Sequence, residues 1–139
     1  MPLDDLVFEA SFAAGPRAAA AARSAVVAAI DGHVDSRLLA AAELVVSELV
    51  TNSVEHAGLD AGEALRVAAA VSDSLLRLEV HNRGATGTIA LGEPDLERGG
   101  GFGLYLVDAL THAWGVSRSD HTVVWAEVIC GPPHAATPP

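Results

Sequence analysis

The chain contains no lysine, and its eight basic residues are all arginines. They are outnumbered by 18 acidic residues, which leaves a formal net charge of −10. An acidic protein repels the phosphate backbone of nucleic acids, and the sequence has no basic stripe that could offset this repulsion. Nucleic acid is therefore not an expected partner. The absence of lysine also excludes a P-loop, whose lysine contacts the phosphates of a bound nucleotide.

Cysteine and long apolar runs are equally scarce. Cys130 is the single cysteine, so no internal disulfide can form, and a reducing cytoplasm is the simplest location. No apolar run reaches the length of a membrane span, and the acidic start from Met1 to Asp5 lacks the basic region of a signal peptide. We expect a cytoplasmic protein without a membrane segment.

Aromatic residues are few: two tryptophans, one tyrosine and three phenylalanines. Half of the 139 residues are nevertheless hydrophobic, mostly alanine and valine, which is enough to bury a core of small aliphatic side chains. We predict one domain over residues 1–130. The last segment, 131–139, is rich in proline and should be disordered.

The hydrophobic pattern alternates between period 2 and period 3.6, which predicts strands and helices that share one core. The expected fold is α+β, a two-layer α/β sandwich with a mixed, mainly antiparallel sheet and helices on one face. Strands are predicted over 8–12, 65–71, 75–82, 115–118 and 122–129. The second and third are expected to form a hairpin that turns at Ser72-Asp73-Ser74. Helices are predicted from Pro16 to about Asp31-Gly32, from an N-cap at Asp35 or Ser36 to Ala57, and from Gly103 to about Ala113.

The second of these helices has an apolar stripe that ends in polar residues. The residues that recur at three- and four-residue steps are Leu38, Ala42, Val45, Leu49, Asn52 and His56. Glu48 borders the stripe one turn before Asn52. A carboxylate and an amide one turn apart at the edge of an apolar face can handle a proton and a metal ion.

Asn82 ends the predicted strand over 75–82. Alternation places it on the same face as Leu76, Leu78 and Val80, whereas Arg77, Glu79 and His81 take the other face. Asn82 should therefore point towards the core.

A glycine run opens the third predicted helix. It consists of Gly99, Gly100, Gly101 and Gly103, and the amides of Gly103 and Leu104 begin the helix. Glycine allows the backbone to approach a ligand closely, and a helix N-terminus favours anions, so this run is a candidate phosphate loop. The preceding residues, 83–98, are expected to form a flexible loop or lid.

Taken in order, these segments resemble the GHKL (Bergerat-fold) ATPase superfamily, which includes gyrase and the histidine kinases. The segment Glu48-Leu-Val-Thr-Asn52-Ser-Val-Glu-His-Ala57 is most similar to the corresponding segment of the anti-sigma-factor serine/threonine kinases. The resemblance covers Phe8 to Ile129, and the helix and glycine segments together make it specific.

The resemblance implies ATP and Mg²⁺ as ligands. It makes Glu48 the general base and Asn52 the Mg²⁺ ligand. It places adenine near Asn82, Gly84 and Thr122. The phosphates would lie against Gly99, Gly100, Gly101, Gly103 and Leu104.

Asn82 departs from the family, which has aspartate in an Asp-x-Gly segment at this position. The sequence here is His81-Asn82-Arg83-Gly84. An amide oxygen still accepts a hydrogen bond from the adenine amino group but lacks the charge of a carboxylate. The loss is on the order of 1.5–3 kcal/mol, or one to two decades of affinity.

The resemblance leaves two functional hypotheses. The first is an ATP-dependent regulator that binds a sigma factor and phosphorylates a STAS-domain anti-anti-sigma partner on serine. The second is a degenerate binding module with weak or no ATP binding that sequesters a partner, for which Asn82 is the argument. A detached histidine-kinase ATPase domain is disfavoured, since we find no helix pair carrying a phosphoacceptor histidine. A homodimer is left open.

Overall fold

The computed structural model describes residues 6–56, 63–72, 75–82, 102–118 and 121–129. They form five strands and three helices in the predicted order. The strands are β1 (Leu6–Ala13), β2 (Ala64–Ser72), β3 (Leu75–Asn82), β4 (Ala113–Arg118) and β5 (Thr122–Ile129). The helices are α1 (Ala18–Ile30), α2 (Ser36–His56) and α3 (Phe102–Leu110). The bounds of β3 and β5 are those that the alternation pattern predicts.

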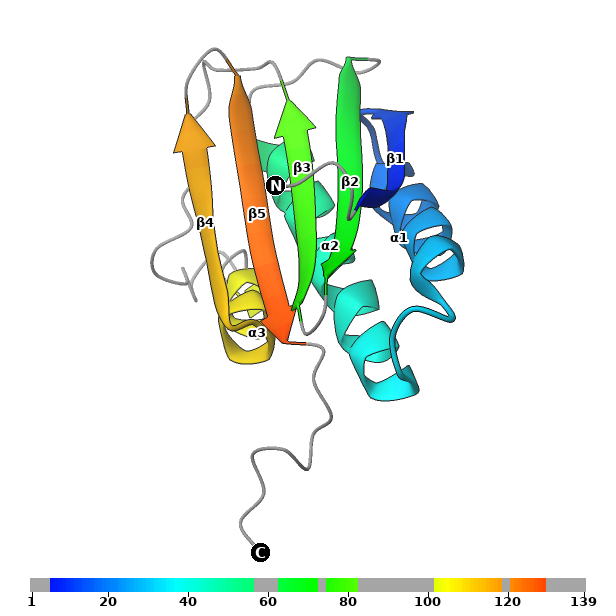
Figure 1. Ribbon diagram of the computed structural model, residues 1–139. Helices are drawn as coiled ribbons and strands as arrows, with labels where there is room; N and C mark the ends of the chain where they lie inside the picture. Colours follow the sequence, from blue (N-terminus) through cyan, green and yellow to red (C-terminus); the bar gives the residue numbers. More distant parts are fainter. Residues whose placement is uncertain (1–5, 57–62, 73–74, 83–101, 119–120, 130–139) are drawn as a thin grey trace, which may run out of the picture.

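The strands form one sheet in the order β1-β2-β3-β5-β4 (Figure 1). All of the pairings between these strands are antiparallel, so the expected mixed sheet contains no parallel pair among the described strands. β2 and β3 are consecutive and adjacent, as the predicted hairpin requires, with Ser72 opposite Leu75. The turn residues between them, 73–74, lie outside the described residues.

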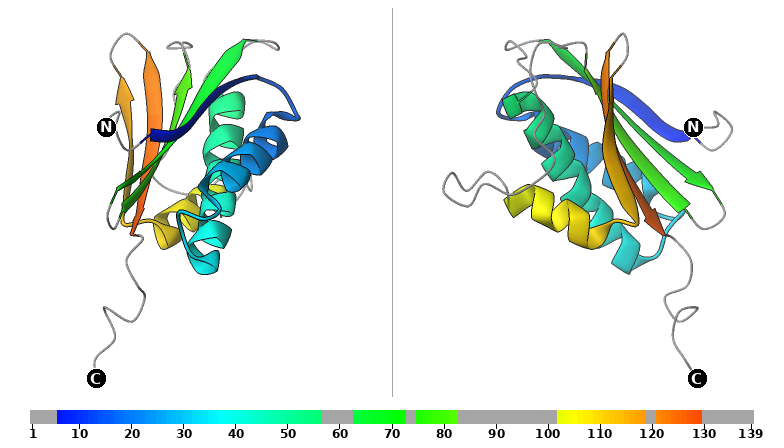
Figure 2. Two further views of the ribbon diagram at one scale, coloured as in Figure 1. Left: turned by 45° about the vertical axis from the view of Figure 1, so that its right-hand side comes forward. Right: turned by 90° about the vertical axis from the view of Figure 1, so that its left-hand side faces the viewer.

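The three helices cover one face of the sheet and leave the other face open (Figure 2). The core between the two layers consists mainly of small aliphatic side chains, as the composition predicts. Its largest fully buried members are leucine, isoleucine and valine. The two-layer α+β architecture is confirmed.

The ends of the first two helices follow local chemistry. Helix α1 begins at Ala18, so Pro16 lies just before the helix rather than at its first position. After α1, Gly32 has a φ of +98°, which disfavours any residue with a Cβ. Asp35 caps α2, since its Oδ1 accepts a hydrogen bond from the Leu38 amide at 2.8 Å. Of the two predicted caps, Asp35 is therefore the one used.

Helix α3 ends earlier than predicted. It stops at Leu110, and Ala113, the predicted helix end, is the first residue of β4. The Thr111 hydroxyl donates to the Val107 carbonyl at 2.7 Å, and the His112 amide donates to the Glu127 carbonyl at 2.7 Å. The residues after Leu110 therefore pair with β5, although the apolar pattern alone would continue the helix.

Among the described residues, no helix combines the length and apolar character needed to cross a bilayer.

Candidate functional site

The C-terminal half of α2 carries polar side chains into the interior. Asn52 is 6 % exposed and Ser53 is fully buried, and both follow the buried Leu49 and Val50 along the helix. The apolar stripe predicted for this helix is buried from Leu38 onwards and ends in polar residues, as expected. The side chain of His56, predicted to close the stripe, is not described.

Asn82 and Thr122 lie directly opposite each other on neighbouring strands, β3 and β5. Each is 2 % exposed, and alternation directs both towards the helical layer, in line with Val80 and Val124. The sequence predicted that Asn82 would face the core and linked Thr122 to it only through the family resemblance. The strand register places the two residues together.

Four buried polar residues come from these elements, Asn52 and Ser53 on α2, Asn82 on β3 and Thr122 on β5, and we call them the polar cluster. Within the described part of the chain, four of its side-chain atoms have no hydrogen-bond partner: Asn52 Oδ1, Ser53 Oγ, and both Nδ2 and Oδ1 of Asn82. Leaving a buried polar atom unpaired costs about 1–3 kcal/mol, and nearly all such atoms in proteins are paired. Such a concentration of unpaired atoms is typical of a site completed by a ligand or by water.

The members of the polar cluster come from elements that meet at one end of the molecule. Helix α2 packs on β3 and β5. The C-terminal end of α2, the end of β3 and the start of β5 all lie at the end drawn uppermost in Figure 1. Figure 2 shows the same end from two further directions, with α2 facing the sheet across the core.

Asn52 suits the predicted magnesium role. Its unpaired Oδ1 is a hard oxygen acceptor, the ligand type that Mg²⁺ prefers. Mg²⁺ commonly takes one or two protein oxygens and completes its shell with nucleotide phosphates and water, so one amide oxygen fits such a site. The residues present are compatible with a magnesium–nucleotide complex.

Glu48 lies one helical turn before Asn52 and is partly buried. Burial raises the pKa of its carboxyl group, and the negative charge of Glu55 raises it further. A carboxylate with a raised pKa is a better proton acceptor at neutral pH, so the environment of Glu48 suits general-base catalysis.

The predicted phosphate loop lies mostly outside the described residues. Gly84 and the glycines at 99, 100 and 101 are not described. Gly103 and Leu104 lie in the first turn of α3, as predicted, but their side-chain surroundings are not described. Helix α3 packs against α2, which carries Glu48 and Asn52. The predicted binding roles of these glycines and of Leu104 stay predictions.

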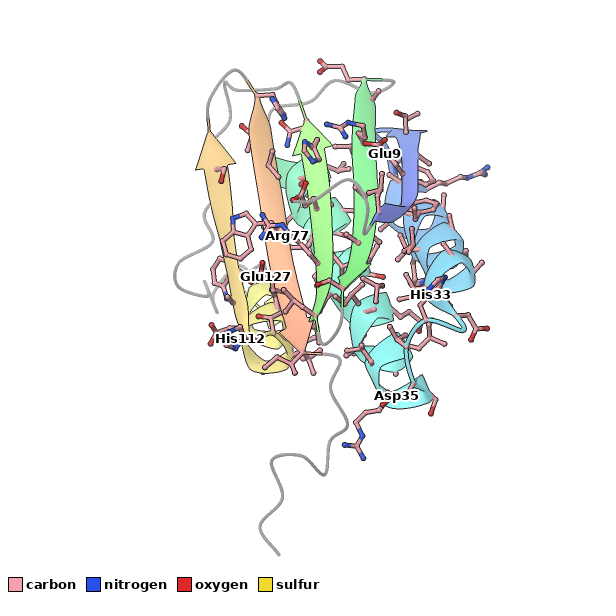
Figure 3. The ribbon with its side chains drawn as sticks, in the orientation of Figure 1. Glu9, His33, Asp35, Arg77, His112 and Glu127 are labelled. Carbon is pink, nitrogen blue, oxygen red and sulfur yellow. The ribbon has the colours of Figure 1, made fainter. Side chains whose placement is uncertain are left out.

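The open face of the sheet carries a separate ionic network. The Arg77 guanidinium donates to Glu79 at 2.6 Å and to Glu127 at 2.7 Å. It also lies over the ring of Trp125, 4.6 Å from the ring centroid. Arg77 on β3 and Glu127 on β5 are labelled in Figure 3. Glu79 also bonds His81 at 2.7 Å. The hydrogen bond from His81 lowers the pKa of Glu79, burial opposes this, and Arg77 lowers it further, to about 2. This network lies on the face opposite the polar cluster and holds β3 to β5.

His81 has a defined hydrogen-bonding role in this network. Its Nδ1 lies 3.1 Å from the Arg66 guanidinium, which can only donate, so Nδ1 is the accepting nitrogen. Its Nε2 then carries the proton and donates to Glu79. The ring also stacks on His121, with 5.2 Å between ring centroids. Arg66 pairs in turn with Glu9 on β1, so the network crosses the sheet from β1 to β5.

Ser53 is the member of the polar cluster that the sequence interpretation did not identify. Its position was readable: it lies four residues after Leu49 and three after Val50, which puts it on the buried side of α2. A search for apolar residues passes over a serine at a buried helix position. The signal that could have identified Ser53 is a hydroxyl on the buried side of the helix, next to the predicted metal ligand.

Comparison with known families gives one match that spans most of the chain. Residues 12–128 match the model of the histidine kinase-like ATPase domain. The matched segment contains all four residues of the polar cluster, Glu48 and the predicted phosphate loop. None of the curated proteins compared with the chain matches it.

Proposed function

Because the chain belongs to the histidine kinase-like ATPase family, we propose that it binds ATP with Mg²⁺ at the polar cluster and transfers phosphate to a serine of a regulatory partner protein. The single observation that carries the proposal is the set of unpaired, buried polar atoms on Asn52, Ser53 and Asn82. Family membership supports ATP binding. The kinase activity, the partner and a cytoplasmic location are our proposal.

Each residue has a defined task in this proposal. The amide oxygen of Asn52 holds Mg²⁺, which supplies charge neutralisation for the phosphates when it is bound. Glu48, with its raised pKa, accepts the proton of the attacking hydroxyl. Asn82 and Thr122 contact the base from neighbouring strands. The glycines that precede α3, with the first amides of that helix, bind the phosphates.

The partner follows from the resemblance to anti-sigma-factor serine kinases. We propose a STAS-domain protein as the phosphate acceptor and a sigma factor as the regulated partner, with transcription as the process controlled. The chain's net charge of −10 is consistent with action through proteins rather than through direct contact with DNA.

A second function has a specific observation in its favour. Asn82 replaces the carboxylate that this family uses towards adenine, so the chain could be a binding module that sequesters a partner without catalysis. Both polar atoms of the Asn82 side chain are buried without a partner among the described residues, which favours ligand binding over this alternative. A protein that no longer bound a ligand here would gain stability if an apolar residue replaced Asn82.

Calorimetric titration with ATP, with and without Mg²⁺, separates the two functions. The kinase proposal predicts that the binding heat saturates and that the affinity for ATP is higher with Mg²⁺ than without it. Equal, negligible heats under both conditions would leave the sequestering module. Incubation with γ-labelled ATP and candidate STAS-domain proteins then tests phosphoryl transfer, with label on serine as the expected result.

A further inference from the structure

The side chain of Asn82 offers a nucleotide base both a donor and an acceptor. A carboxylate at this position could only accept hydrogen bonds, whereas an amide presents Nδ2–H and Oδ1 side by side. Asn82 is 2 % exposed, and neither atom has a partner within the described residues. Both atoms are therefore available to a ligand.

Nothing in the described part of the protein fixes which way the amide faces. A hydrogen bond from a neighbour would hold Oδ1 and Nδ2 in one arrangement, but no such bond is present there. Rotation of the amide by 180° exchanges donor and acceptor at little cost. The neighbouring hydroxyl of Thr122, directly opposite on β5, can itself donate or accept and so suits either arrangement.

The two arrangements match two classes of purine. A 6-aminopurine such as adenine presents a donor at the 6-position beside an acceptor at N1 or N7. A 6-oxopurine such as hypoxanthine or guanine presents an acceptor at the 6-position beside a donor at N1. An amide can pair with either in a bidentate manner. A carboxylate can accept from the N1 proton of a 6-oxopurine, but it has no donor for the 6-oxo oxygen and repels it.

We infer that Asn82 relaxes base selection, so that the site accepts 6-oxopurine nucleotides as well as ATP. The inference rests on the proposed function, since it concerns the nucleotide bound at the polar cluster. The amide in place of a carboxylate thus broadens the range of phosphate donors at some cost in affinity for adenine.

Calorimetric titration with ATP and ITP tests the inference, because the two nucleotides differ in the 6-position group and the N1 proton. We expect the affinities of the unmodified protein for ATP and ITP to agree within about tenfold. Asn82→Asp should tighten ATP binding by about tenfold or more and weaken ITP binding, so that the ratio of affinities rises by at least about tenfold. Asn82→Leu, which has similar volume but no polar atoms, should weaken both nucleotides by similar factors and leave their ratio near that of the unmodified protein.

Each outcome has a distinct meaning. If the unmodified protein prefers ATP to ITP by a hundredfold or more, the relaxed-selection inference is wrong while the proposed function stands. The same conclusion follows if Asn82→Asp folds, by circular dichroism, yet leaves the ratio unchanged. If neither nucleotide binds, the proposed function itself fails. The ratio of ATP and ITP affinities can be measured on the unmodified protein alone. The inference is therefore tested even if a variant fails to fold.

Discussion

Asn52 ends the apolar stripe of α2 with a nearly buried amide whose oxygen is unpaired. The fully buried Leu49 and Val50, which precede it, are the apolar residues that anchor this part of α2 in the core. A residue of this kind can be changed with little effect on the fold but a large effect on any ligand that its oxygen binds.

Asn52→Ala is therefore expected to abolish Mg²⁺-dependent nucleotide binding while the thermal unfolding curve changes little or shifts upwards. Removal of a buried amide oxygen that has no partner removes its desolvation cost, which offsets the small cavity that is left. ATP titration with and without Mg²⁺ measures the first effect. Ser47→Ala on the same helix is the control and should bind as the unmodified protein does. Unchanged Mg-ATP binding by Asn52→Ala would mean that another residue holds the metal.

Glu48 should act on chemistry more than on binding. Glu48→Gln keeps the shape of the side chain and removes the proton acceptor, so phosphoryl transfer should fall by about two to four decades with little change in ATP affinity. Glu43→Gln, at an exposed position on the same helix, is the matched control and should retain activity. If Glu48→Gln keeps its turnover, the base is elsewhere, and Glu55 is the next residue to test.

Helix α2 is the element that positions both of these residues, and its start is fixed by one side chain. The Asp35 carboxylate accepts the Leu38 amide at 2.8 Å, which satisfies a backbone donor that the helix cannot satisfy internally. The cap lies at the opposite end of α2 from the polar cluster, so it should influence stability rather than ligand contacts.

Asp35→Ala should lower the free energy of unfolding by about 1 kcal/mol, because the helix loses its N-cap. Chemical denaturation of the unmodified and substituted proteins measures the difference. Ser36→Ala is the control, since Ser36 is the neighbouring residue that the sequence offered as an alternative cap. A loss of stability in Ser36→Ala instead of Asp35→Ala would contradict the observed cap.

Across the whole molecule, the two faces of the sheet have different tasks. The helical face holds the core and the polar cluster, whereas the open face holds a network that links neighbouring strands through Glu9, Arg66, His81, Glu79 and Arg77. Burial opposes the charge of Arg77, but its hydrogen bonds to Glu79 and Glu127 outweigh this and raise its pKa. Arg77 and Glu79 therefore both stay charged at neutral pH.

The low pKa of Glu79 predicts how stability depends on pH. In the folded protein the pKa is about 2, against a reference value of 4.5. The contribution of Glu79 is thus fully present above about pH 4.5 and is lost as the pH falls towards 2, and its size is roughly 2–3 kcal/mol. Urea denaturation between pH 6 and pH 2 measures it.

Glu79→Gln isolates this contribution from those of the other carboxylates, which also weaken the protein in acid. The variant should be less stable than the unmodified protein at pH 6, and the difference should shrink as the pH approaches 2. A difference that stays constant over this range would mean that the pKa of Glu79 is the same in the folded and unfolded states.

The sequence by itself determined the elements and the faces that they present. Alternation along β3 put Asn82 on the core side and Glu79 on the other, and the helical period of α2 put Asn52 at the end of a buried stripe. These features depend on neighbours within one turn or one strand, so a local pattern contains them. The segment from Glu48 to Ala57 and the glycine segment together also indicated the family that the comparison then identified.

Only the tertiary structure decided which of these residues meet. The register that sets Asn82 opposite Thr122 comes from pairing between distant segments, and no local pattern specifies it. Ser53 is buried because α2 packs on β3 and β5, and α3 stops at Leu110 because β4 pairs with β5. Glu79 is nearly buried on the open face because Arg77 and His81 surround it. In each case the outcome depends on contacts between elements, and their free energies outweigh the local preferences that a sequence pattern records.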